Sequence, residues 1–163
     1  MSYQARIARF CQSFDAAPQK EILLSRTLFR AAAMLEMRIN EALEPCGMNM
    51  PQYLAMAMLL ADENAPPTNP SEVSKLLDMT RTQVTRLMDS LETAGWVTRT
   101  LDKEDRRRMM LTLTPEGKTQ LNRAVPVVHA VYHRAWSVFD NDSQDQIAAE
   151  LTHFHEGLEN QTA

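Results

Sequence analysis

Apolar residues recur at helical spacing along most of the chain. In residues 3–14, Ile7, Phe10 and Phe14 fall on one face, which predicts a short amphipathic helix. A long helix is expected to follow to about Leu43. Its apolar positions are Ile22, Leu28, Phe29, Ala32, Leu35, Ile39 and Leu43. The pattern therefore indicates a mainly helical protein.

A strongly apolar helix is predicted next, near residues 51–63. Asn49 and Gln52 have the spacing of a capping box, in which each side chain bonds to the other residue's backbone N–H. Residues 53–60 are apolar almost all the way round the helix, and such a helix lies inside a core rather than on a surface.

Two short amphipathic helices joined by a tight turn follow. The first is expected over residues 71–78, and the second begins at Thr80, which has the spacing of another capping box with Gln83. Gly95 supplies the left-handed conformation that ends a helix. The apolar positions of the second helix are Val84, Leu87, Met88 and Leu91. Two helices in this arrangement predict a helix-turn-helix motif.

The periodicity then changes to that of a β-hairpin. Residues 96–100 and 109–113 have the composition and length of strands, and the charged segment 101–108 joins them. A hairpin with a basic tip, directly after a helix-turn-helix, is typical of the wing of a winged helix.

Two further helices are predicted after the hairpin. The first starts at Thr114 and runs to about Phe139, and the second is capped by Asp142 or Ser143 and ends near Glu159. Their apolar positions have no evident partner inside a compact winged helix.

The expected fold class is therefore mainly α with a small β-hairpin wing. Residues 49–114 would form a winged helix-turn-helix DNA-binding domain. Residues 1–48 and 115–163 would supply flanking N- and C-terminal dimerisation helices that build a homodimer.

Composition and charge agree with a globular protein that has one basic region. Of the 163 residues, 44% are hydrophobic and 23% are charged, and the net charge is −4. Between Arg81 and Lys118 there are eight basic and six acidic residues, so the basic residues concentrate on the motif. The chain has no apolar run of the roughly 20 residues that a membrane span needs, and no secretory signal is evident. With only two cysteines, the expected location is the cytoplasm.

The second helix of the motif presents side chains that are suited to reading DNA. Arginine can bind guanine with two hydrogen bonds, glutamine can bind adenine, and threonine can contact phosphate or a thymine methyl. A polar helix face by itself is more often solvated surface, but the capping boxes, the turn and the hairpin favour the DNA interpretation. The predicted contacts from this helix are Thr80, Arg81, Thr82, Gln83, Thr85 and Arg86.

The tip of the hairpin carries Asp105, Arg106, Arg107 and Arg108. Three adjacent guanidinium groups repel one another unless anions lie nearby. One of them can enter a narrow minor groove while the others contact phosphates. We expect all four residues to belong to the DNA site.

The wing segment 105–117 resembles the signature of the MarR family: aspartate, any residue, arginine, then alternating apolar residues, Leu-Thr and a nearby glycine. Residues 91–97 resemble that family's link from recognition helix to wing. Within the family, residues 18–26 and 95–97 are similar to a group of repressors of multidrug pumps. The resemblance covers about residues 20–160.

This resemblance implies a homodimer that places one recognition helix in each of two successive major grooves of a pseudo-palindromic operator. It implies that Arg107 enters the minor groove and that Asp105 holds it in place. Members commonly repress transcription and are released by small phenolic or lipophilic compounds, bound between the dimerisation helices and the DNA-binding lobe. Neither a cofactor nor a membrane partner is implied.

Candidates for the effector site are weaker. Met34 and Met56 belong to a methionine-rich region that would suit a broad-specificity apolar pocket, although methionine is more often ordinary core. Arg26, Arg30 and Tyr53 could add polar contacts to an aromatic acid.

Two alternatives stay open: a regulator of the same fold that senses oxidants through Cys11 or Cys46, and a winged helix that binds protein. His129 and His133 have i, i+4 spacing, but without a third ligand they favour packing over metal binding. Nothing in the sequence indicates an enzyme.

Overall fold

The computed structural model describes residues 2–61, 70–101 and 109–161. These residues are mainly helical and include one two-stranded antiparallel hairpin, which confirms the expected fold class. The helices and strands in chain order are α1 Tyr3–Cys11, α2 Gln19–Leu43, the 3₁₀ turn η1 Glu44–Cys46, α3 Met50–Ala61, α4 Pro70–Leu76, α5 Arg81–Thr93, β1 Val97–Leu101, β2 Met109–Leu113, α6 Pro115–Trp136 and α7 Asn141–Asn160.

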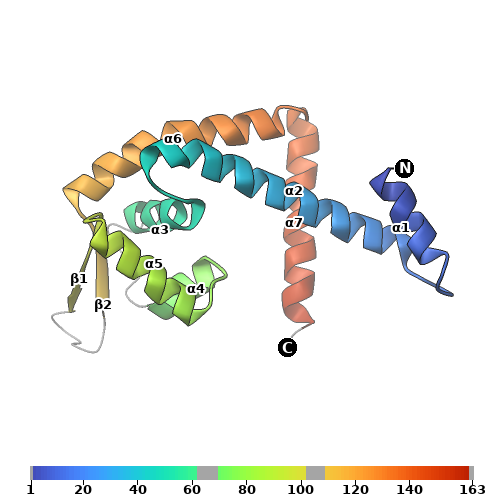
Figure 1. Ribbon diagram of the computed structural model, residues 1–163, viewed down its shortest axis with the longest axis horizontal. Coiled ribbons are helices and arrows are strands. Elements are labelled where there is room, and N and C mark those ends of the chain that lie inside the picture. The colour runs from blue at the N-terminus through green and yellow to red at the C-terminus, as the bar shows by residue number, and fades with distance from the viewer. Residues whose placement is uncertain (1, 62–69, 102–108, 162–163) are drawn as a thin grey trace.

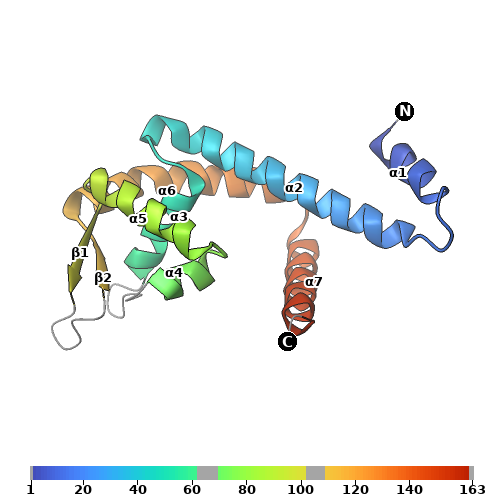
Figure 2. The same ribbon diagram turned by 60° about the horizontal axis from the view of Figure 1, so that its bottom comes forward.

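The helices and strands form a lobe at one end and a pair of long helices that leads away from it. Helices α3, α4 and α5 gather beside the β1–β2 hairpin, while α2 and α6 lie side by side (Figures 1 and 2). Helix α1 lies at the far end of α2, and α7 projects from the end of α6. No described helix combines the length and apolarity that crossing a membrane requires.

The local signals in the sequence define most helix ends. Both hydrogen bonds of the Asn49–Gln52 capping box form, each at 3.0 Å, and the Thr80–Gln83 box forms as well. Gly95 follows α5 with φ of 72°, the left-handed conformation that a glycine adopts at low cost.

Some predicted bounds were wrong. The cap of α7 is Asp140, whose Oδ1 accepts a hydrogen bond from the Ser143 N–H at 2.9 Å, rather than Asp142 or Ser143. Hydrogen bonding from the Ser143 side chain, and then from its backbone N–H, lowers the pKa of the Asp140 carboxyl because it stabilises the ionised form. The helix α1 ends at Cys11, three residues before the predicted end.

The core lies where the lobe meets the two long helices. It joins side chains from α2, α3, α5, the hairpin and α6, and α3 lies inside it as its apolar sequence predicts. The largest fully buried side chains are Ile39, Leu43, Met56, Leu91, Leu111, Leu121, Val84, Val97 and Val128. Helix α7 contributes no buried residue.

Candidate nucleic-acid interface

Helix α5 has a buried face and an outward polar face, as its sequence predicts. Val84, Leu87, Met88 and Leu91 are buried, which fixes the rotation of the helix. All six of its predicted DNA contacts are exposed: Thr80, Arg81, Thr82, Gln83, Thr85 and Arg86. In the described part of the chain, neither Arg81 nor Arg86 forms an ion pair, so both guanidinium groups are available to an anion.

Local hydrogen bonds limit what three of these side chains can do. The Gln83 Oε1 atom accepts a hydrogen bond from the Thr80 N–H at 2.8 Å, and Thr80 Oγ1 accepts from the Gln83 N–H at 3.4 Å. Thr85 Oγ1 donates to the Arg81 carbonyl at 3.0 Å. Gln83 therefore keeps its amide NH₂ for a partner, but two hydrogen bonds to one adenine would require the cap to open.

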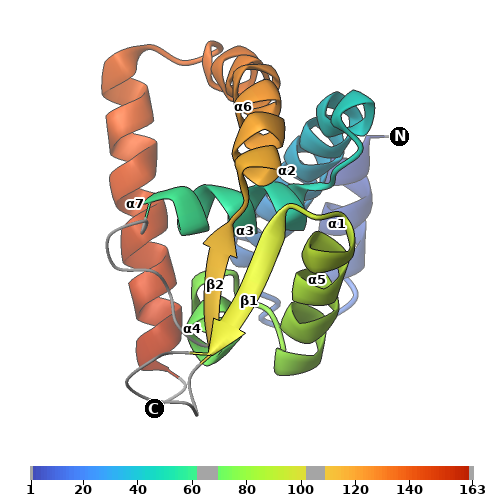
Figure 3. The same ribbon diagram turned by 90° about the vertical axis from the view of Figure 1, so that its left-hand side faces the viewer.

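The hairpin lies beside α5, with β1 on the side of that helix (Figure 3). Its strands pair from Val97 opposite Leu113 to Leu101 opposite Met109. The predicted wing residues Asp105, Arg106, Arg107 and Arg108 fall between Leu101 and Met109, outside the described residues.

The base of the hairpin is joined closely to α6. The Thr114 N–H donates to the Trp96 carbonyl at 3.0 Å, and Thr114 Oγ1 donates to the Gly95 carbonyl at 2.7 Å. The same oxygen accepts from the Gly117 N–H at 2.9 Å and so caps α6. The end of α5, the wing and α6 therefore meet at a single residue.

Sequence reasoning missed Arg99 on β1. Its guanidinium lies 2.5 Å from Asp89 Oδ1 and 3.3 Å from Glu92 Oε2, both on α5. The signal that could have found it is strand alternation. Arg99 shares a face with the buried Val97, so a charged residue occupies a position that faces the protein.

The predicted effector residues do not form one site. Arg26 donates from Nε to the Tyr3 hydroxyl at 2.9 Å, and the Arg30 guanidinium lies 4.4 Å from the centre of the Tyr3 ring. Both arginines on α2 therefore contact α1. Tyr53 and Met56 lie in the core. Burial raises the pKa of the Tyr53 phenol, and the nearby Tyr132 phenol raises it further.

A pocket of about 940 Å³ is lined by residues of α2 and α6. Its walls are mostly apolar and include Met34, which was predicted, together with the basic side chains Arg38 and Arg134. The full lining is Ala31, Met34, Leu35, Arg38, Glu41, Ala42, Ala130, Val131, Arg134, Ala135, Trp136 and Phe139. Sequence reasoning could not find this pocket, because its two walls lie far apart along the chain.

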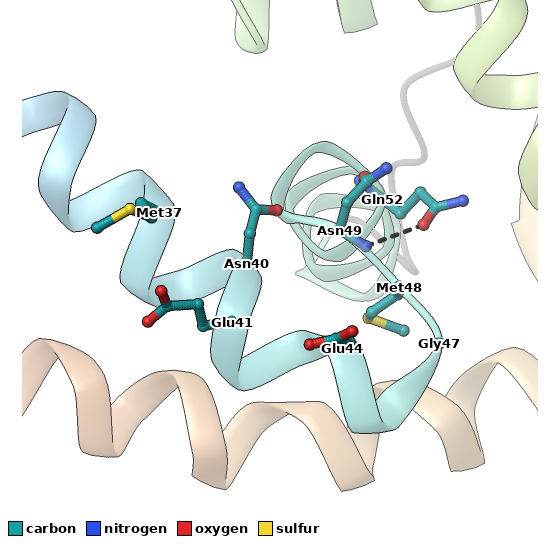
Figure 4. Close-up of a pocket in the computed structure, with 8 residues that line it drawn as sticks. All are labelled: Met37, Asn40, Glu41, Glu44, Gly47, Met48, Asn49 and Gln52. Carbon is teal, nitrogen blue, oxygen red and sulfur yellow. Dashed lines mark hydrogen bonds between the residues drawn. The ribbon is translucent and has the colours of Figure 1, made fainter.

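A shallower hollow of about 630 Å³ lies where α2 ends and α3 begins (Figure 4). Glu41 and Glu44 give it an acidic side, and the Asn49–Gln52 capping bond crosses its other side. The hollow is more open than the pocket between α2 and α6, so it would bury less of a ligand's surface.

The other predicted candidates are not assembled into a site. His129 and His133 are exposed, and no group of three potential metal-ligating side chains occurs in the ranges that the structure describes. Cys11 is buried and Cys46 is half-buried, both as free thiols.

Comparison with known proteins identifies the family. A model described as the MarR family matches residues 47–108. The transcriptional repressor MprA of Escherichia coli K12 is 35% identical over 130 residues, which cover 80% of this chain and 73% of MprA. The chain belongs to the MarR family.

Two solved structures show the same fold. The MarR-family chain superposes on CouR from Rhodococcus jostii RHA1, bound to p-coumaroyl-CoA, with a TM-score of 0.72 and 27% identity, covering 80% of this chain and 90% of CouR. It superposes on Rv2887 of Mycobacterium tuberculosis, in complex with p-aminosalicylic acid, with a TM-score of 0.63 and 25% identity, covering 81% and 98% of the two chains. The predicted winged-helix fold and family are confirmed.

Proposed function

We propose that this MarR-family protein is a homodimeric transcriptional repressor and not an enzyme. Its α5 enters the major groove of a pseudo-palindromic operator, with half-sites about 10 bp apart. The observation that carries the proposal is the outward face of α5, where Arg81 and Arg86 are exposed and unpaired among the described residues. MprA, a repressor by name, supports the direction of regulation.

The wing supplies the second contact. Arg107 enters the minor groove with Asp105 holding it, while Arg106 and Arg108 contact phosphates. Residues 49–114 act as the DNA-binding unit, and residues 1–48 and 115–163 as the dimerisation region. The shared core couples the two, because α2 and α6 pack against α3, and α3 in turn packs against α5.

Dimerisation follows from the apolar residues that the single chain leaves exposed. On α7 these are Leu151, Phe154 and Leu158, which recur at helical spacing. Phe10 on α1, Phe14 in the turn after it, and Leu24 and Phe29 on α2 are each more than half exposed as well. A second copy of the chain would cover both groups.

The pocket between α2 and α6 is the effector site in this proposal. Its volume suits a drug-sized molecule, and Arg134 suits an aromatic acid, whereas the Arg38 guanidinium is paired with Glu41 at 2.9 Å. CouR and Rv2887, whose structures contain p-coumaroyl-CoA and p-aminosalicylic acid, support an aromatic ligand. Of the five predicted effector residues, Met34 lines this pocket. The other four, Arg26, Arg30, Tyr53 and Met56, do not line it; they stay candidates for ligand contacts in a second conformation of the protein, one that binds DNA less well.

The test is a fluorescence-anisotropy titration with an operator duplex selected by the protein from a randomised library. Arg81→Ala, Arg86→Ala and Arg107→Ala should each weaken binding about tenfold, since a base contact contributes about 1–3 kcal/mol. Arg9→Ala, on α1 far from the lobe, is the matched control and should change little. A protein that selects no sequence, or keeps full affinity in all three variants, would favour a protein-binding role.

The cysteine-sensing alternative has its own test. Cys11 is only 4% exposed, which limits its contact with oxidants. A variant with Cys11→Ser and Cys46→Ser should respond to p-aminosalicylic acid as the parent does, and loss of response to peroxide alone would favour redox control.

A further inference from the structure

Arg99 is a charged residue at an inward-facing position of the wing. Along β1, Val97 is buried and Thr98 and Thr100 are exposed. The Arg99 guanidinium reaches acidic side chains of α5, so Arg99 lies on the side that faces this helix. Its side chain is only 23% exposed. The Nε atom is buried and forms no hydrogen bond within the described residues, although it lies 3.3 Å from Glu92 Oε2.

The partners of Arg99 lie one turn apart on α5. Asp89 and Glu92 are separated by three residues, so their carboxylates share a face and converge on one guanidinium, at 2.5 and 3.3 Å. Both are near the C-terminal end of the helix, where the helix dipole disfavours negative charge. Two acidic residues at this end therefore do not stabilise the helix by themselves. They do hold the Arg99 side chain against it.

This ion pair contributes little to overall stability. The Asp89 and Glu92 side chains are 57% and 47% exposed, and exposed ion pairs are weak because water screens them. Its effect on geometry is larger. A two-stranded hairpin is barely stable alone, and this one is held at its base by Thr114 and along its length by contact with α5.

We propose that Arg99 is a positioning residue: by binding Asp89 and Glu92 it fixes the wing against the recognition helix, so that the wing and the helix contact DNA in one fixed relative orientation. The inference rests on the DNA-binding function proposed above. Arg99 does not itself contact phosphate, because its guanidinium is engaged by the two carboxylates.

One double variant distinguishes a positioning role of Arg99 from direct contact with phosphate, because the two roles predict opposite changes in DNA affinity. The double variant Asp89→Asn, Glu92→Gln removes two negative charges from the DNA-facing lobe and releases Arg99. If Arg99 were a phosphate contact, that variant would bind DNA more tightly. If Arg99 positions the wing, the variant binds the selected duplex about tenfold more weakly, while its affinity for a scrambled duplex of equal length holds or rises.

Three further proteins complete the anisotropy experiment. Arg99→Met keeps the unbranched stem without the charge and should match the double variant in lost affinity, with a melting temperature within about 2 °C of the parent. The triple variant should bind no more weakly than either, because all three residues act through one link. Glu36→Gln with Glu44→Gln makes the same charge change at exposed sites outside the lobe and should not weaken binding.

Each outcome has a distinct meaning. Unchanged or tighter binding of the selected duplex by the Asp89→Asn, Glu92→Gln variant would overturn the inference, as would a triple variant in which the losses add. If the parent protein selects no sequence at all, the proposed function fails instead. If the parent selects a duplex and Arg107→Ala weakens its binding while the Asp89→Asn, Glu92→Gln variant does not, only the inference about Arg99 fails.

Discussion

At the scale of single residues, Gly117 is the glycine with the least room around it in the described chain. A Cβ atom at Gly117 would lie 2.1 Å from the Trp96 carbonyl oxygen, which is backbone and cannot turn aside. Only a glycine lets the first turn of α6 approach the base of the wing this closely. The hydrogen bonds of Thr114 require the same approach.

Gly117→Ala should therefore lower the free energy of unfolding by about 1–3 kcal/mol, because the wing must move away from α6. Gly157→Ala is the matched control: nothing lies within 4 Å of the place that a Cβ atom would occupy there in α7. It should raise stability by up to about 1 kcal/mol through helix propensity. Urea unfolding measures both, and equal effects would contradict the close packing.

Tyr53 makes stability depend on alkaline pH. Burial raises the pKa of its phenol above the ordinary value of 10.0, so the folded protein binds the proton more tightly than the unfolded chain. The contribution of the protonated Tyr53 phenol to the free energy of unfolding is complete below about pH 10 and is lost as the pH rises through the folded-state pKa. Tyr53→Phe should remove that loss. Urea unfolding of the parent and of Tyr53→Phe from about pH 8 to 11 checks this. If the two proteins lost stability in parallel as the pH rises, the prediction would be wrong.

At the scale of elements, the start of the recognition helix has two roles. Thr80 and Gln83 satisfy each other's backbone N–H groups and so fix where α5 begins. The same two residues belong to the proposed DNA contacts. The cap therefore sets the orientation of Arg81 and Arg86 before DNA is bound, which reduces the ordering that binding requires.

Thr80→Ala should lower the free energy of unfolding by about 1 kcal/mol and weaken operator binding as well, since the first turn of α5 frays. Thr119→Ala, at an exposed position inside α6, removes the same hydroxyl from a helix without removing a cap. It should leave both quantities nearly unchanged. Thermal unfolding and anisotropy on the two variants check this, and a Thr80→Ala protein with parental stability would show that the cap is dispensable.

At the scale of the whole molecule, α7 stands apart from the lobe and buries none of its residues (Figure 1). A helix in a protein draws most of its stability from the packing of its apolar face, and the apolar stripe of α7 is exposed in the single chain. Its stripe therefore needs a partner surface, which the proposed second copy supplies.

Phe154→Asp should convert the dimer largely to monomer at micromolar concentration, because it places a charge in the apolar stripe. Thr152→Asp is the control, since a residue two positions away points to the opposite side of the helix. Sedimentation velocity distinguishes the two. Dissociation by both variants, or by neither, would count against α7 as the dimer interface.

Much of the fold could be predicted from the sequence because its signals are local. Capping boxes at Asn49 and Thr80, the left-handed Gly95 and the change to strand periodicity each involve residues within a few positions of one another. The helix-turn-helix, the hairpin and the outward face of α5 follow from them. The cap at Asp140 was missed because three acidic or hydroxyl residues compete for that role within four positions.

Tertiary structure alone decided the contacts between distant segments. That Tyr3 occupies Arg26 and Arg30, that α2 and α6 enclose a pocket, and that Arg99 reaches Asp89 and Glu92 depend on how helices and strands pack after they form. Periodicity assigns a side chain to a face but does not identify its partner. The sequence by itself determined that this chain carries a winged helix with a polar, arginine-bearing recognition face. Tertiary packing determined which side chains of the hairpin and of α3 contact α5 and so fix the position of that face.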